Sequence, residues 1–192
     1  MTHKVLYSLA LSLFTMICVC LPVMYASATS VIELTDDQFV SLSSEIVHGR
    51  IQSVESFVYS EQVILTRVTL EVQTWLKPAD KTDDVFVFYT RGGTVGDKSQ
   101  TIPGEVEPVV GDEVVVFLER IPRYQNYPMV LGLKQGAFYA EADAAGRQKR
   151  MAQNMRDLTV RPTLNYSISS FKTARTLDDL IVQIRSKLAE RK

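Results

Sequence analysis

Hydrophobic and polar residues alternate along much of this chain. In residues 63–76, Val68, Leu70 and Val72 alternate with charged and polar residues, and a period of two predicts a strand with one buried face. Two other runs, 85–90 and 113–119, are almost wholly apolar, which is typical of central strands. Together these patterns predict six strands, at residues 45–57, 63–76, 85–90, 113–119, 127–133 and 137–142.

Helical spacing replaces this alternation near both ends. Thr35, followed three residues later by Gln38, forms a capping box and predicts a short helix over residues 34–40. Thr176, with Asp179 three residues later, caps a second predicted helix. An apolar stripe follows at helical spacing: Leu177, Leu180, Ile181, Ile184 and Leu188. We expect this stripe to pack on the strands. A partner protein is the alternative, and a membrane surface is disfavoured because bulky aromatic anchors are missing.

The connections are expected to be turns and one long loop. Residues 91–112 are rich in glycine and proline and predict a loop without regular structure. Gly132 and Gly136 suggest bulges or sharp bends. Residues 151–158 have a weakly helical pattern, and residues 162–173 are polar and irregular.

These elements predict a mainly β protein. Closing the strands on themselves would remove exposed sheet edges. We therefore expect a small antiparallel OB-like barrel, closed or partly open, with a short N-terminal helix and an amphipathic C-terminal helix.

The first 28 residues read as a secretory signal peptide. Lys4 precedes an apolar run over residues 5–21, and Ala26-Ser27-Ala28 is a small-x-small cleavage site. An uncleaved anchor is the alternative, although the run is short for a membrane span. The predicted divisions are a signal peptide (1–28), a β-barrel domain (29–146) and a basic tail with the C-terminal helix (147–192), in an exported protein that is periplasmic or secreted.

Composition removes several kinds of chemistry. Cys18 and Cys20 both lie in the predicted signal, so the exported chain would hold no cysteine and one histidine, His48. A structural zinc site is thereby excluded, and we expect no metal and no cofactor. Charge is uneven: residues 29–146 carry 18 acidic and 9 basic residues, and residues 147–192 carry 11 basic and 4 acidic ones. We expect the basic tail to fold on the acidic body or to stay solvated, and we expect no nucleic-acid partner because aromatic residues do not interleave the basic ones.

Four segments resemble a group of uncharacterised exported bacterial β-barrel proteins. They are residues 45–51, 66–72, 111–118 and 131–136, together with a Gly-Gly loop at residues 91–96. The resemblance implies a class of protein and no particular activity. The strand order is also similar to the netrin-like, OB-type barrel of tissue inhibitors of metalloproteinases. Those inhibitors act through an N-terminal cysteine, which Thr29 does not supply, so only a barrel that presents loops to a partner is implied.

Catalytic interpretations rest on few residues. His48 is the only histidine available to a Ser-His-acid arrangement, and a mid-strand histidine is more often structural. The acidic clusters 80–84 and 105–113 lack the spacing of a calcium loop. Residues 92–96 are glycine-rich, but no phosphate-loop lysine follows, so we expect these glycines to permit positive φ in a tight loop.

Two loops carry the residue types that dominate binding sites. Arg91, Gly92 and Gly93 open the long loop. Arg120, Arg123, Tyr124 and Tyr127 lie in or beside a proline-flanked loop at residues 122–128, and tyrosine and arginine are enriched in binding hot spots. Tyrosines that merely cover the barrel end are the alternative. The sequence thus predicts a non-enzymatic protein-binding module whose partner is an envelope or extracellular protein, for example a protease. The alternative is a small exported hydrolase that uses carboxylates or His48.

Overall fold

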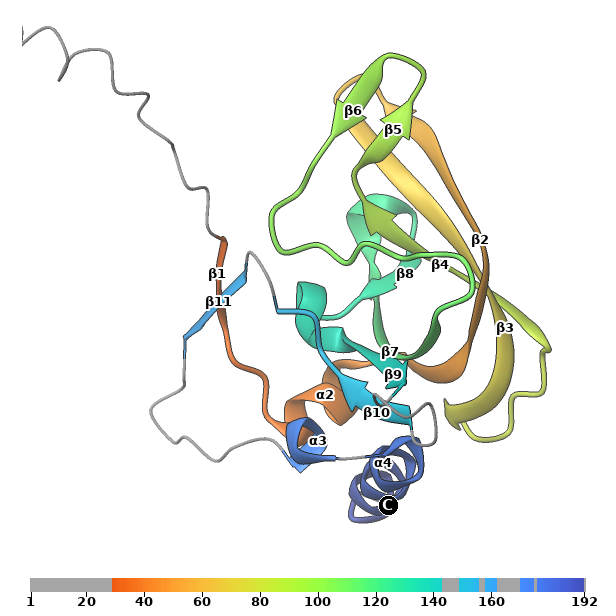
Figure 1. Ribbon diagram of the computed structural model, residues 1–192, viewed down its shortest axis with the longest axis vertical. Coiled ribbons are helices and arrows are strands. Elements are labelled where there is room, and N and C mark those ends of the chain that lie inside the picture. The colour runs from red at the N-terminus through yellow and green to blue at the C-terminus, as the bar shows by residue number, and fades with distance from the viewer. Residues whose placement is uncertain (1–28, 143–148, 156–157, 162–169, 175, 192) are drawn as a thin grey trace, which may run out of the picture.

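A computed structural model describes residues 29–142, 149–155, 158–161, 170–174 and 176–191 (Figure 1). The predicted signal peptide lies outside these residues. Their elements are β1 (Thr29–Ile32), α2 (Asp36–Leu42), β2 (Glu45–Ser60), β3 (Val63–Lys77), β4 (Val85–Arg91), β5 (Gly93–Val95), β6 (Lys98–Gln100), β7 (Glu113–Ile121), the 3-10 turn η1 (Pro122–Tyr124), β8 (Tyr127–Val130), the 3-10 turn η2 (Leu133–Gly136), β9 (Ala137–Ala142), β10 (Lys149–Ala152), β11 (Leu158–Arg161), α3 (Ser170–Thr173) and α4 (Leu177–Ala189).

Seven strands form one sheet that closes on itself. Their order is β10-β9-β7-β2-β3-β4-β8, and an additional β7–β8 pairing joins the last strand to the third. Strands β2, β3, β4, β8 and β7 therefore make a five-strand ring, to which β9 and β10 are appended (Figure 1). The prediction of a mainly β fold is confirmed. Within the ring, β4 and β8 run parallel, whereas the sequence prediction was wholly antiparallel.

Alternating side chains of the ring enter two separate cores. On β7, Val114, Val116 and Leu118 join one buried cluster, and Val115 and Phe117 join the other. The apolar run of β7 is buried because both of its faces are covered, as expected for a central strand. The first cluster fills the ring, and the second lies between the ring and the helices.

Helix α2 begins at the predicted capping box. The Thr35 hydroxyl accepts a hydrogen bond from the Gln38 amide (3.2 Å), and the Gln38 side chain accepts one from the Thr35 amide (2.9 Å). Phe39 is fully buried in the second core. Asp36 accepts a hydrogen bond from the Ser170 amide (2.9 Å), so the N-terminal helix is tied to the C-terminal part of the chain.

Helix α4 packs its apolar stripe on the second core, as the sequence predicts. Leu180 and Ile184 are 0% exposed. Lys172 contacts Glu33 (2.5 Å) and Lys187 contacts Asp37 (3.4 Å), so described parts of the basic tail do fold on the acidic body. Leu180 and Ile184 are therefore not available to a partner protein in the folded chain.

Three sequence predictions are wrong at the level of elements. The 91–112 segment holds the β5–β6 hairpin, whose short strands are too polar for a hydrophobic pattern to mark. The strand expected over 127–133 ends at Val130, because Gly132 (φ 63°) adopts a left-handed conformation and begins η2. The described residues among 151–158 are not helical: β10 pairs with β9, and β11, which begins at Leu158, pairs in parallel with β1, which the sequence pattern did not mark.

None of the described helices is both long enough and apolar enough to cross a membrane.

Candidate binding surface

Five aromatic side chains gather near η1, where β2 and β4 end and β8 begins. We call Phe57, Tyr59, Tyr89, Tyr124 and Tyr127 the tyrosine cluster. Tyr89 and Tyr127 are stacked, with ring centroids 4.2 Å apart. Tyr59 meets Tyr124 edge-on at 5.6 Å and Tyr127 at 6.3 Å, and Phe57 meets Tyr89 at 6.1 Å. All five are partly exposed, so the cluster forms a continuous aromatic surface.

The loop between β7 and β8 is shaped to support this cluster. Pro122 begins η1, and Gln125 and Asn126 take positive φ angles of 54° and 58° to turn the chain back. The Tyr59 hydroxyl donates a hydrogen bond to the Arg123 carbonyl oxygen (3.3 Å), which fastens the tip of β2 to this loop. The Arg123 guanidinium lies 4.8 Å from the Tyr124 ring centre, a cation–π contact.

Arg120 is oriented away from the tyrosine cluster. Its Nε donates to the Glu45 carboxylate (2.8 Å), which is buried, and its Nη1 donates to the Asn126 carbonyl oxygen (3.2 Å). These bonds give Arg120 a structural task, since they hold β2 and the β7–β8 loop together. Only the exposed part of the Arg120 side chain is still predicted to contact a partner.

Arg91, Gly92 and Gly93 end β4 and open the hairpin. The Arg91 Nε donates to the Glu105 carboxylate (2.6 Å), whose side chain is only 5% exposed. Burial raises the pKa of Glu105, an effect that Arg91 opposes. The interpretation of the glycines is confirmed: Gly92 and Gly93 have φ angles of 88° and 128°.

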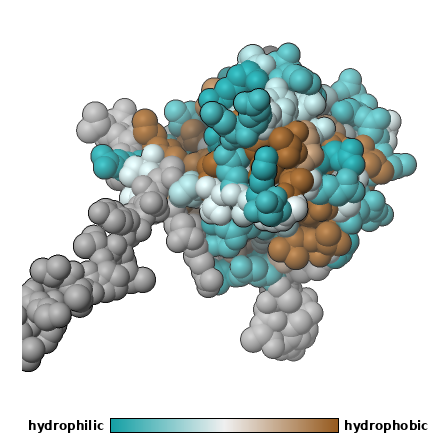
Figure 2. All heavy atoms as spheres, turned by 90° about the horizontal axis from the view of Figure 1, so that it is seen from above, coloured by the Kyte–Doolittle hydropathy of each residue, from teal (hydrophilic) through white to brown (hydrophobic). Residues whose placement is uncertain are grey.

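A polar cavity of about 430 Å³ opens beside these residues. Hydroxyl side chains of Ser56, Thr66, Thr90, Thr94, Ser99 and Thr101 line it together with Arg91 and Glu105. Arg91 is two residues from Tyr89 on β4, and the Tyr89 ring stacks on Tyr127, so this one strand contributes to both the cavity and the tyrosine cluster. Figure 2 looks on to this hairpin end, whose surface is a mosaic of hydrophilic and hydrophobic patches.

His48 lies in a buried polar contact. Its side chain is 5% exposed, and its Nε2 is 3.1 Å from the Glu113 carboxylate. Arg50 also contacts Glu113 and donates to the Gly111 carbonyl oxygen (2.8 Å). This set fastens β2 to the start of β7, and it leaves His48 out of reach of a substrate on the surface.

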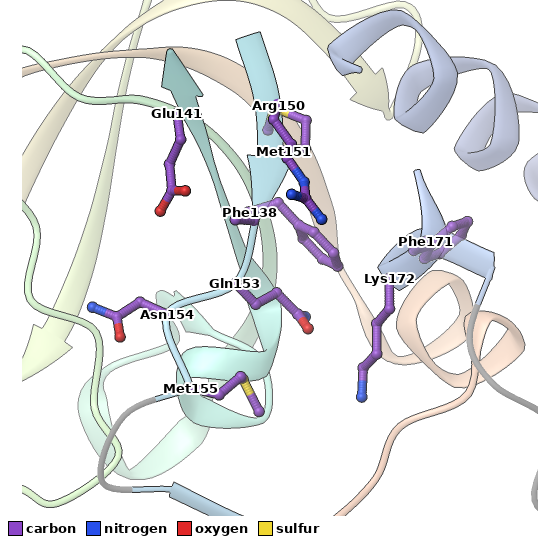
Figure 3. A pocket seen from close by; sticks show the side chains of 10 residues that line it. Phe138, Glu141, Arg150, Met151, Gln153, Asn154, Met155, Phe171 and Lys172 are labelled. Atoms are coloured by element: carbon purple, nitrogen blue, oxygen red, sulfur yellow. The ribbon is translucent and has the colours of Figure 1, made fainter. Parts of the chain in front are cut away.

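A larger hollow of about 700 Å³ lies between β9, β10 and α3 (Figure 3). Phe138 and Phe171 belong to its walls, with Glu141, Arg150 and Lys172. The Lys172 ammonium is already paired with Glu33. Among the described residues, no group of three or more His, Cys, Asp or Glu side chains is arranged to hold a metal ion.

Comparison with known proteins adds no relative: no family model matches the chain, and no curated protein or solved structure is significantly similar to it. The resemblances to exported bacterial proteins and to the netrin-like domain therefore stay predictions.

Sequence reasoning missed Phe57, Tyr59 and Tyr89 as members of the surface. A signal was present, because Phe57 and Tyr59 follow Glu55 at a period of two and thus share its outward face. Their contact with the β7–β8 loop depends on ring closure, which a strand pattern does not reveal.

Proposed function

We propose that this protein is an exported, non-enzymatic protein-binding module of the cell envelope. Its five-strand ring would serve as an OB-type barrel, and the tyrosine cluster with Arg123 would contact the partner. Periplasmic or secreted location is part of this proposal and rests on the signal-like sequence of residues 1–28.

The order of the strands supports an OB-type barrel. In chain order the ring strands are β2, β3, β4, β7 and β8, and β4 pairs with β8 in the single parallel contact of the ring. OB-folds are five-stranded, partly open barrels that bind ligands on the face of their second and third strands, between the loops that follow the first and fourth strands. Here Tyr59 lies near the end of the first strand, next to the loop that follows it, and the loop after the fourth strand supplies Tyr124. The third strand supplies Tyr89.

The tyrosine cluster is the observation that carries the proposal. Four tyrosines and one phenylalanine from three strands and a loop form one surface, with an exposed arginine stacked on its edge. Tyrosine and arginine dominate binding hot spots because they offer large, rigid contact area with polar ends. Their packing on one another also lowers the entropy that they would lose on binding.

The hydrolase alternative is supported less well. His48 is buried against Glu113, and the buried carboxylate of Glu105 is occupied by Arg91. Neither group is placed to attack an external substrate.

Affinity capture from a cell envelope, with the partner then purified, tests the proposal. Tyr124→Ala and Arg123→Ala should each weaken partner binding by tenfold or more, as truncation of a hot spot does. The control is Gln73→Ala, an exposed position on β3 outside the cluster. Unchanged affinity in both cluster variants would contradict the proposal. His48→Gln, which keeps a hydrogen-bonding side chain beside Glu113, should leave binding intact, whereas a hydrolytic activity lost in that variant would favour the alternative.

A further inference from the structure

An apolar groove lies between the β3–β4 connection and helix α4, apart from the tyrosine cluster. It encloses about 680 Å³. Trp75, Pro78 and Ala79 line one side, and Leu188 and Ala189 line the other. Ligand sites commonly have volumes of about 300–1,000 Å³ and predominantly apolar walls, so this groove has the size of a ligand site.

Cationic residues border the groove. Lys77 and Arg185 belong to its lining. Arg191 lies near enough to Lys77 to lower its pKa, in addition to the larger effect of burial. Asp80 is the one carboxylate of the lining. Among the lining residues, two cations therefore accompany one carboxylate, and the groove favours an anion.

The cations differ in how strongly they are held by the protein. The Lys77 ammonium donates to the carbonyl oxygens of Val40 (2.8 Å) and Ser43 (2.6 Å) and so closes the end of α2. The Arg185 side chain is exposed and makes no hydrogen bond or ion pair with the part of the chain that the structure describes. The Arg185 guanidinium is thus the group best placed to pair with a negatively charged group of a ligand.

We propose that this groove binds a long-chain fatty acid. The acyl chain lies along Pro78, Ala79, Leu188 and Ala189, and the carboxylate meets Arg185 and Arg191 at the rim. An apolar wall next to a cationic rim selects a ligand with one apolar tail and one negative end, and burial of the tail supplies most of the affinity.

The single tryptophan of the chain makes the test direct, because Trp75 lines the groove. Titration with cis-parinaric acid, a fluorescent polyene fatty acid, should give saturable energy transfer from Trp75. Palmitate should compete. Among shorter competitors, each two added methylenes should tighten binding by about tenfold until the groove is filled, since a buried methylene contributes about 0.8 kcal/mol. Decanol should compete less well than decanoate.

Variants on α4 separate this site from others. Ala189→Glu places a carboxylate in the groove and should abolish the transfer, whereas Ser186→Glu, an exposed position of the same helix outside the groove lining, should not. Arg185→Gln should weaken fatty-acid binding by about two- to five-fold and leave decanol unaffected. The proposal is overturned by an absence of saturable transfer, by equal transfer in Ala189→Glu and Ser186→Glu, or by equal competition from decanol and decanoate.

Discussion

Arg91 and Glu105 show how single residues shape the hairpin end of the molecule. Their ion pair is largely withdrawn from water and fastens the segment after β6 to the end of β4. The pKa of Glu105 is raised because the cost of burying its charge exceeds the stabilisation that Arg91 returns. A carboxyl whose pKa is raised by folding stabilises the protein below its unfolded pKa, and this contribution is lost as the pH rises through the folded value.

Replacement of Glu105 with Gln should therefore change the pH dependence of stability. Above about pH 4, where an unfolded glutamate ionises, the wild type should lose stability relative to Glu105→Gln as the pH rises. Urea unfolding of both proteins between pH 4 and 8 measures the difference. If the difference in free energy of unfolding stays constant with pH, or grows in favour of the wild type, burial of Glu105 does not govern the pH dependence of stability.

Gly93 offers a second prediction at this scale. Its φ of 128° is unfavourable for other residues, and a Cβ atom there would overlap the hydroxyl groups of Ser56 and Thr66. Gly93→Ala should lower the free energy of unfolding by about 1–3 kcal/mol. Gly96→Ala is the matched control, because Gly96 also has positive φ (60°) but its Cβ would meet no atom within 4 Å. If thermal or urea unfolding shows the same loss of stability in Gly93→Ala and Gly96→Ala, backbone strain alone is responsible and the overlap with Ser56 and Thr66 is not.

At the scale of elements, capping fixes where the helices begin. The Thr176 hydroxyl accepts a hydrogen bond from the Asp179 amide (3.2 Å), and the Asp179 carboxylate accepts one from the Thr176 amide (3.3 Å). Thr176→Ala should destabilise the protein by about 1 kcal/mol. Ser186→Ala, at an exposed position within α4, should change stability little. A smaller urea midpoint shift for Thr176→Ala than for Ser186→Ala would contradict the capping assignment.

Local signals explain which elements were predictable. Both capping boxes and the alternation of Val68 with Leu70 act over a few residues, so the sequence displays them directly. The β5–β6 hairpin has few apolar residues, and β11 is only four residues long and pairs with β1 from the other end of the described chain. Two of the five residues of the tyrosine cluster were predicted, since Tyr124 and Tyr127 lie in an evident loop. The other three, Phe57, Tyr59 and Tyr89, join them through contacts that ring closure creates.

For the whole molecule, the two cores make the C-terminal part structurally necessary. Phe171, Leu180 and Ile184 are completely or almost completely buried in the core that covers the outside of the ring. A chain that ends at Gly146 would expose the matching surface of Phe39 and Phe117. We predict that this truncated chain lacks a cooperative unfolding transition in calorimetry, whereas a full chain with Val182→Ala, an exposed position of α4, keeps it. A cooperative transition in the truncated chain would mean that the ring folds alone.

The measurement that tests the binding role most directly is site-specific photo-crosslinking in the cell envelope with the full chain. A photoreactive phenylalanine derivative would replace Tyr124 in one experiment and Gln73 in a second. If the tyrosine cluster contacts the partner, position 124 should give one adduct of defined mass and position 73 should give none. Adducts from position 73 alone, or from neither position, would contradict the binding role of the tyrosine cluster.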